Sequence, residues 1–215
     1  MNKHYTDITL VVDRSGSMES CKTDAEGGLN TFIQEQATEP GKGLLTLVEF
    51  DDKYDFVHRG MPLAEVPRYG LVPRGMTALY DAVGRAINET GERLAAMPEE
   101  ERPGAVIFAI VTDGHENSSH EFTHARVKDM IEHQKATYNW QFTFLGADMD
   151  AVAIGAALGV GAGGSVATSS TDCHASYATL SKKVSQVREA AILGQSLSID
   201  YTADEREEAA GKKLG

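Results

Sequence analysis

Cysteine and long hydrophobic runs are both scarce in this chain of 215 residues, whose only cysteines are Cys21 and Cys173. Two cysteines do not make a disulfide framework, so we expect reduced, buried or partly buried thiols. No apolar run approaches the roughly 20 residues that a membrane-spanning helix needs. The first residues lack the basic segment and apolar stretch of a signal peptide. We therefore expect a cytoplasmic protein that does not use a membrane as its partner.

Positive charge is also scarce, with 20 lysines and arginines against 32 aspartates and glutamates and a formal net charge of −12. This balance argues against nucleic acid or an anionic membrane as the main partner. The length suits one α/β domain with a sizeable core. We assign residues 1–197 to that domain. We expect 198–215 to be a polar C-terminal tail, solvated or partly disordered, because it has few apolar anchors.

Segments of strand and helix type alternate along the chain, which predicts a mostly parallel central sheet with helices on both faces. The expected strands span residues 6–12, 44–50, 54–58, 105–112, 140–145 and 165–168. Helical spacing of apolar residues covers 25–33, 79–94, 125–136, 150–158 and 177–191. The short turn at 51–53 indicates a hairpin. One antiparallel strand should therefore lie at the edge of a six-stranded sheet.

One carboxylate and two hydroxyls follow directly on the first apolar strand, as Asp13, Ser15 and Ser17. Gly16 lies between the serines and lets the backbone turn tightly enough for three side-chain oxygens to converge. Hard oxygen ligands without imidazole or thiolate suit Mg²⁺, Mn²⁺ or Ca²⁺ and fit Zn²⁺ poorly. This segment is therefore a candidate site for a divalent metal ion.

The pattern Asp-x-Ser-x-Ser resembles the metal-ion-dependent adhesion site (MIDAS) of von Willebrand factor A (vWA) domains. Two further segments match the rest of that site in the family's order. Thr77 lies ahead of a long predicted helix, and Asp113 lies at the end of the predicted strand 105–112. The resemblance implies a doubly wound, Rossmann-like α/β fold with the metal site at the carboxyl edge of its sheet, where open α/β sheets bind ligands. The implied metal ligands are Asp13, Ser15, Ser17, Thr77 and Asp113.

The same resemblance implies a protein-interaction module and not an enzyme. In the family one coordination position stays open, and a glutamate or aspartate from a protein ligand completes the shell of the ion. Asp13, Ser15 and Ser17 should bind the ion directly, Asp113 through water, and Thr77 in either way. The chain is similar to small stand-alone bacterial or phage members. Stand-alone intracellular members often act as adaptors, some beside AAA+ ATPases of the MoxR type, which makes such an ATPase a candidate partner.

Two enzyme classes stay open as alternatives. A metal-assisted phosphoester hydrolase at the same ion would need a general base and a phosphate clamp, and the motifs offer only Arg14 and Arg74 nearby. A zinc protease is suggested by residues 120–124, which spell H-E-x-x-H. That chemistry needs both histidines on one helical face. Because Thr123 is a good N-cap, we expect the helix to begin after it and to leave His120 in the loop.

A glycine-rich segment, residues 159–164, satisfies the dinucleotide pattern G-x-G-x-x-G. That fingerprint needs a strand before it and a helix after it, whereas here a predicted helix precedes and a short strand follows. We interpret the segment as a helix stop followed by a connection, and we do not expect it to bind NAD.

Several charged residues near the motifs are harder to assign. Asp81 lies one helical turn after Thr77, where it either supports the metal site or is an ordinary first-turn carboxylate favoured by the helix dipole. Arg14 is expected to project outward towards an acidic group of a partner. His115 and Glu116 either rim the site or belong to a solvated loop. We interpret three other carboxylates as surface charges without a metal role, namely Asp24, Asp51 and Asp52.

Overall fold

The computed structural model describes residues 1–170 and 172–211, and its centre is a six-stranded sheet in the order β3-β2-β1-β4-β5-β6. Neighbouring strands are parallel except for the β2–β3 pair, which is antiparallel and places β3 at one edge. The predicted mostly parallel sheet with one antiparallel edge strand is therefore confirmed. The strands are β1 (Asn2–Asp13), β2 (Lys42–Phe50), β3 (Tyr54–Pro62), β4 (Pro103–Thr112), β5 (Gln141–Ala147) and β6 (Ser165–Thr168).

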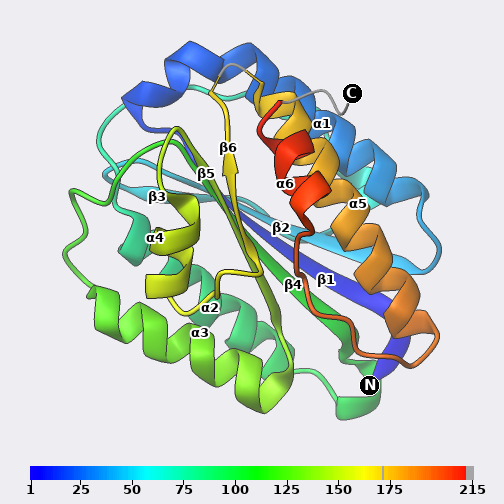
Figure 1. Ribbon diagram of the computed structural model, residues 1–215. Helices are drawn as coiled ribbons and strands as arrows, with labels where there is room; N and C mark the ends of the chain where they lie inside the picture. Colours follow the sequence, from blue (N-terminus) through cyan, green and yellow to red (C-terminus); the bar gives the residue numbers. More distant parts are fainter. Residues whose placement is uncertain (171, 212–215) are drawn as a thin grey trace.

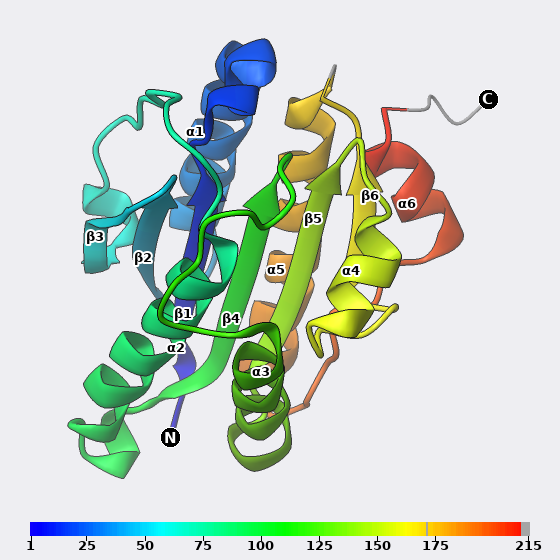
Figure 2. The same ribbon diagram turned by 90° about the vertical axis from the view of Figure 1, so that its left-hand side faces the viewer.

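Helices cover both faces of this sheet, as Figures 1 and 2 show. One face carries α1 (Lys22–Thr38) and α5 (Cys173–Ile192), and the other carries α2 (Leu79–Ala95), α3 (His124–Tyr138) and α4 (Ala151–Ala157). A sixth helix, α6 (Ala203–Ala209), packs beside α5 and β6. Three short 3₁₀ helices complete the described elements, η1 (Gly16–Cys21), η2 (Leu63–Glu65) and η3 (Glu99–Glu101). The doubly wound arrangement follows because β2 lies on one side of β1 whereas β4, β5 and β6 lie on the other, so right-handed crossovers place their helices on opposite faces.

The central strand β1 is buried on both faces, which explains its nearly continuous apolar sequence. Leu10 and Val12 belong to the core beneath α1 and α5, whereas Val11 belongs to the core beneath α2, α3 and α4. The buried carboxylate of Asp7 is neutralised by Arg93 of α2, with two N–O distances of 2.8 Å. Strand β1 is therefore held between two packed layers.

The C-terminal segment differs from the expected polar tail. Residues 198–211 run along the molecule and include α6, which begins with a capping box at Thr202. Three side chains anchor this segment in the core, Ile199, Tyr201 and Ala209, with exposed fractions of 3%, 6% and 0%. The structure corrects the expectation for these residues, because three anchors so far apart give no periodic signal in the sequence. Residues 212–215 lie outside the described residues.

The two cysteines are buried and do not form a disulfide, as their small number predicted. Cys21, at the end of η1, and Cys173, at the start of α5, are both buried and free. Within residues 1–170 and 172–211, no helix combines the length and the hydropathy needed to cross a membrane.

Candidate metal centre

Four of the five predicted metal residues lie at the carboxyl ends of two adjacent strands. Asp13 is the last residue of β1, and Ser15 and Ser17 follow it in the turn that enters η1. Asp113 comes directly after β4, which pairs in parallel with β1. Both strands end at the same edge of the sheet, the upper edge in Figure 2. Their side chains therefore meet where a crevice forms in open α/β sheets.

A chain of hydrogen bonds joins these four residues. The backbone N–H of Ser15 donates to Asp13 Oδ1 at 2.6 Å. Ser15 Oγ lies 3.0 Å from Ser17 Oγ, and Ser17 Oγ donates to Asp113 Oδ1 at 2.7 Å. The two serines thus bridge the two carboxylates, as oxygen ligands around one centre would.

Thr77 approaches the same place from the loop before α2. A Cβ atom added to Gly114 would lie 2.7 Å from Thr77 Oγ1 and 3.3 Å from Asp13 Oδ2, so both oxygens border one small space. Asn117 fixes this loop, because its Oδ1 accepts from the N–H of Thr77 at 2.9 Å and its own N–H donates to the Thr77 carbonyl at 3.0 Å. Among the described residues, no hydrogen bond engages Thr77 Oγ1. This hydroxyl is free to bind a ligand.

The electrostatics of the cluster favour a cation. Asp13 is fully buried, and this burial raises the pKa of its carboxyl group to about 6 despite hydrogen bonds from Thr112 and Ser15. The nearby charge of Asp113 makes a smaller contribution to this rise, and the pKa of Asp113 is itself raised, chiefly by burial. Two carboxylates and three hydroxyls form a hard, all-oxygen donor set. The residues present therefore fit a divalent ion, whose charge would favour both carboxylates in their ionised form.

Several solved structures have a similar fold. Proximal thread matrix protein 1 from the mussel byssus superposes with a TM-score of 0.57 at 16% identity, over 87% of this chain and 45% of that chain. A von Willebrand factor type A protein from Catenulispora acidiphila gives 0.54 at 16% identity, over 87% and 42%. The ArnB paralog VWA2 from Sulfolobus acidocaldarius gives 0.52 at 18% identity, over 85% and 44%.

The chain has the fold of a vWA domain. It spans less than half the length of these three neighbours. A further structure of the mussel protein, with a TM-score of 0.51 at 16% identity over 87% of this chain and 45% of that chain, has a zinc-occupied MIDAS motif. At 16 to 18% sequence identity, these similarities show a shared fold and nothing more. No family model matches the sequence, and no curated protein matches it either.

Within this vWA fold, Arg14 does not project outward as expected. Its side chain is 8% exposed and binds Glu49 at 3.0 Å, Asp51 at 3.0 Å and Asp55 at 2.5 Å. These three carboxylates belong to the β2–β3 hairpin, which packs beside β1. The prediction that Arg14 meets a partner is wrong, because the hairpin already supplies its anionic partners.

Asp51 is also not a surface charge, since its side chain is only 1% exposed. Its carboxylate accepts hydrogen bonds from Arg14 and Arg74, and its carbonyl accepts from the N–H of Ala78 at 2.7 Å. Burial raises the pKa of Asp51, but Arg74, the Lys53 amide and Arg14 together bring it below its usual value. Asp51 thus ties the loop of Ser15 to the loop of Thr77. The other two carboxylates interpreted as surface charges, Asp24 and Asp52, are exposed.

Among the described residues Asp81 makes no hydrogen bond with Thr77, and it supports the metal site indirectly by holding the loop that follows Asp113. The Asp81 carboxylate accepts hydrogen bonds of 2.8 to 2.9 Å from the backbone N–H groups of residues 120–122. In the opposite direction, Glu116 Oε2 accepts from the N–H of Tyr80 at 3.0 Å. These bonds fasten the loop after β4 onto the start of α2. No pattern in the sequence predicts these pairings, because their members are about 40 residues apart and one member of each lies in an irregular loop. His115, next to Glu116, is exposed.

The H-E-x-x-H segment lacks the helical context of a zinc protease. Helix α3 begins at His124, and the hydroxyl of its N-cap Thr123 accepts from the N–H of Arg126. His120 lies in the preceding loop, so the two histidines do not share a helical face. The glycine-rich segment 159–164 follows α4 and precedes β6, the order that the sequence predicted.

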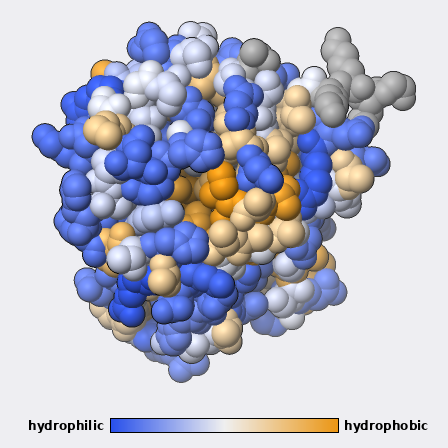
Figure 3. All heavy atoms as spheres, turned by 60° about the vertical axis from the view of Figure 1, so that its left-hand side comes forward, coloured by the Kyte–Doolittle hydropathy of each residue, from blue (hydrophilic) through white to orange (hydrophobic). Residues whose placement is uncertain are grey.

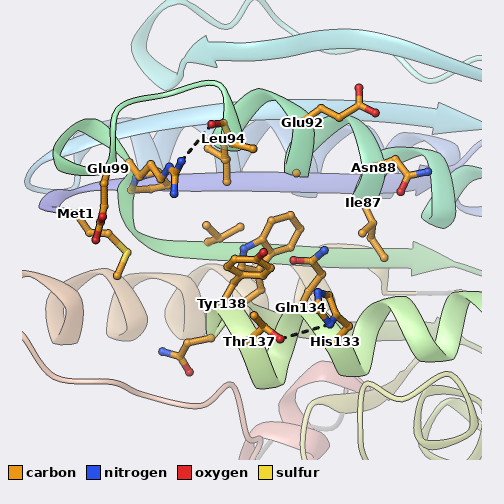
Figure 4. A pocket seen from close by; sticks show the side chains of 17 residues that line it. Met1, Ile87, Asn88, Glu92, Leu94, Glu99, His133, Gln134, Thr137 and Tyr138 are labelled. Atoms are coloured by element: carbon orange, nitrogen blue, oxygen red, sulfur yellow. Dashed lines mark hydrogen bonds between the residues drawn. The ribbon is translucent and has the colours of Figure 1, made fainter.

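A separate cavity of about 750 Å³ lies between α2 and α3, at the other end of the sheet. Figure 4 shows its side chains, with Ile87 and Leu94 projecting from α2 and Gln134 and Tyr138 from α3. Gln134 Oε1 is buried there without a hydrogen-bond partner among the described residues. None of the five predicted metal residues lines this cavity. Cavity size therefore does not mark the metal centre, which is a compact cluster of oxygens.

Proposed function

We propose that this chain is a divalent-metal-dependent protein-interaction module. The observation that carries the proposal is the bridging of Asp13 and Asp113 by Ser15 and Ser17, with the free hydroxyl of Thr77 beside them. These five residues would hold Mg²⁺, or Mn²⁺ or Ca²⁺ in its place. When bound, the ion supplies a positive charge that attracts the glutamate or aspartate of a protein ligand. The site would thus recognise a partner through one carboxylate.

We further propose that the module acts as an adaptor in the cytoplasm, with an AAA+ ATPase of the MoxR type as a candidate partner. This part rests on the resemblance of the motifs to stand-alone vWA proteins and on the fold. It is narrower than the metal-dependent interaction and can fail separately from it.

The surroundings of the site disfavour a phosphoester hydrolase. Such an enzyme needs a cationic clamp for the phosphate. The guanidinium groups of Arg14 and Arg74 are instead engaged by Asp51 and its neighbours on the β2–β3 hairpin. Interaction without catalysis is therefore the function that the geometry supports best.

The test combines ion binding and partner capture. Calorimetry should detect one Mg²⁺ site in the wild type, and Asp13→Ala should lose most of that affinity. Thr77→Ala should bind the ion weakly and fail to capture a partner. An AAA+ ATPase should be retained by the wild type in Mg²⁺ and released by EDTA.

The matched control is Asp24→Ala, which removes an exposed carboxylate close to the site in the sequence. It should bind Mg²⁺ and partner like the wild type, with all circular dichroism spectra matched. Equal partner capture by the wild type in EDTA, Asp13→Ala and Thr77→Ala would show that recognition does not pass through the ion.

A further inference from the structure

A small cavity opens directly beside the candidate metal centre. Its volume is about 220 Å³, and its walls come from the start of α2, from residues 114–116 after β4, from His124 and from one side of α4. Its apolar lining is contributed by Leu79, Ile154, Ala157 and Leu158. Besides Gly114, the other lining residues are Tyr80, His115, Glu116 and His124. The cavity is therefore a recess with an apolar wall on α2 and α4 and a more polar wall on the loop after β4, and it has space for a single side chain of moderate size.

Gly114 connects this recess to the metal residues. It lines the cavity, and a Cβ atom on it would lie 2.7 Å from Thr77 Oγ1 and 3.3 Å from Asp13 Oδ2. Only a glycine-sized residue thus separates the oxygens of the site from the recess. A molecule that places a carboxylate on the ion would have its neighbouring atoms at the mouth of the recess.

The outer wall of the recess continues into an exposed apolar patch. Figure 3 shows hydrophobic side chains gathered over α4 on an otherwise largely hydrophilic face. Helix α4 contains no charged residue, and its exposed or half-buried side chains are Val152, Ala153, Ile154, Ala156 and Ala157. Three of these residues, Ala153, Ala156 and Ala157, are exposed in the structure of residues 1–170 and 172–211. Contiguous apolar patches of this kind mark interaction sites.

The net charge of the molecule gives apolar contact beside the ion a physical role. With a net charge of −12, the chain repels an acidic partner at distances up to the Debye length of about 8 Å. A single carboxylate on the ion must overcome that repulsion. Burial of one leucine-sized side chain would strengthen binding by roughly tenfold to a hundredfold at about 25 cal/mol per Å² of apolar surface. Apolar contact beside the ion thus supplies affinity that the charges do not.

We propose that the protein ligand of the metal site carries an aliphatic or aromatic side chain close to its metal-binding carboxylate, and that this side chain docks between Gly114 and Ile154. This inference rests on the proposed metal-dependent function and narrows its partner to an acidic residue with an apolar neighbour. The extended or looped segment that bears both groups lies across α4.

The probe is a displayed peptide library with a fixed glutamate or aspartate and random flanking residues, selected in Mg²⁺ and eluted with EDTA. We expect leucine, isoleucine, methionine or phenylalanine to be enriched at one position within about four residues of the acid. Replacing that residue by serine in a synthetic peptide should weaken binding by roughly tenfold or more, as the buried apolar area requires.

Two neutral variants of α4 test the location. Ala157→Gln places a polar side chain in the recess, whereas Ala156→Gln makes the same change at the neighbouring exposed residue, which does not line it. We expect Ala157→Gln to weaken the apolar peptide at least tenfold and Ala156→Gln to change it less than threefold. Both should keep the wild-type affinity for Mg²⁺ in calorimetry.

The outcomes separate this inference from the function on which it rests. If EDTA-sensitive peptides show no apolar preference, or if the two variants bind alike, docking in the recess is refuted while the metal-dependent function stands. If no EDTA-sensitive peptide is recovered from a protein shown to bind Mg²⁺, both proposals are overturned.

Discussion

At the scale of single residues, ionisation of the Asp13 carboxyl group destabilises the folded chain when no cation is bound. Burial raises its pKa to about 6, above the roughly 3.9 of an unperturbed aspartate. A carboxyl group whose pKa is higher in the folded than in the unfolded chain makes its full contribution to stability only at pH values below its pKa in the unfolded chain. That contribution is lost as the pH rises through the folded value. The ion-free protein should therefore lose stability between about pH 4 and pH 6.

Asp13→Asn should remove this loss. In EDTA at pH 7.5 we expect the variant to be more stable than the wild type by up to about 3 kcal/mol, since one pKa unit corresponds to about 1.4 kcal/mol. Urea unfolding in EDTA across pH 4 to 8 measures the difference. Saturating Mg²⁺ should stabilise only the wild type. A wild type that is more stable than the variant in EDTA at pH 7.5 would contradict the assignment.

Gly114 is the second residue whose size matters. A methyl group there would lie 2.7 Å from Thr77 Oγ1 and must push this hydroxyl away. Gly114→Ala should therefore weaken Mg²⁺ binding at least tenfold in calorimetry while leaving the folded state intact. The control is Gly27→Ala on α1, where the added methyl group meets nothing within 4 Å. Wild-type affinity in Gly114→Ala would show that Thr77 is not a ligand.

At the scale of elements, the loop after β4 is held by α2 and not by its own sequence. Asp81 binds three backbone N–H groups of residues 120–122. Asp81→Ala should cost about 1 to 3 kcal/mol, because these donors lose a charged acceptor. We expect faster amide hydrogen exchange confined to residues 114–123 and a weaker Mg²⁺ site. Asp129→Ala, which removes an exposed carboxylate from α3, should change neither measurement.

Periodicity predicted the six strands and helices α1 to α5, but not α6, and strand-end chemistry singled out Asp13, Ser15 and Ser17. Thr77 and Asp113 were added by the resemblance to vWA domains. Continuous apolar runs mark strands buried on both faces, and the polar residues directly after them mark the carboxyl edge. The ion pairs of Arg14 could not be predicted in this way, because Asp51 and Asp55 lie about 40 residues away in a turn and on an edge strand. In the sequence, a charged residue beside a metal motif suggests a contact with a partner. The folded hairpin shows that carboxylates of the same chain already neutralise this charge.

At the scale of the whole molecule, the last described segment completes the fold. Tyr201 is 6% exposed, and its hydroxyl lies 2.9 Å from Thr143 Oγ1 on β5. Tyr201→Ala should destabilise the protein by about 3 to 5 kcal/mol, as for other large aromatic side chains in a core. Tyr201→Phe should cost only about 1 kcal/mol, the usual contribution of one hydrogen bond.

Urea unfolding measures both variants of Tyr201. The control is Tyr138→Ala, whose side chain is 59% exposed and should matter little. Equal stability of Tyr201→Ala and the wild type would mean that the C-terminal segment does not pack against the sheet in solution.

The direction of β1 has a practical consequence for how the molecule is presented on a surface. The strand starts near the amino terminus at one end of the sheet and delivers Asp13 to the opposite end, as Figure 2 shows. A molecule attached to a bead through its first residue would stand with the oxygen cluster facing the solvent. Gly211, in contrast, contacts Asp172 just before α5, on the side of the cluster. Attachment through that end would turn the recognition face towards the support.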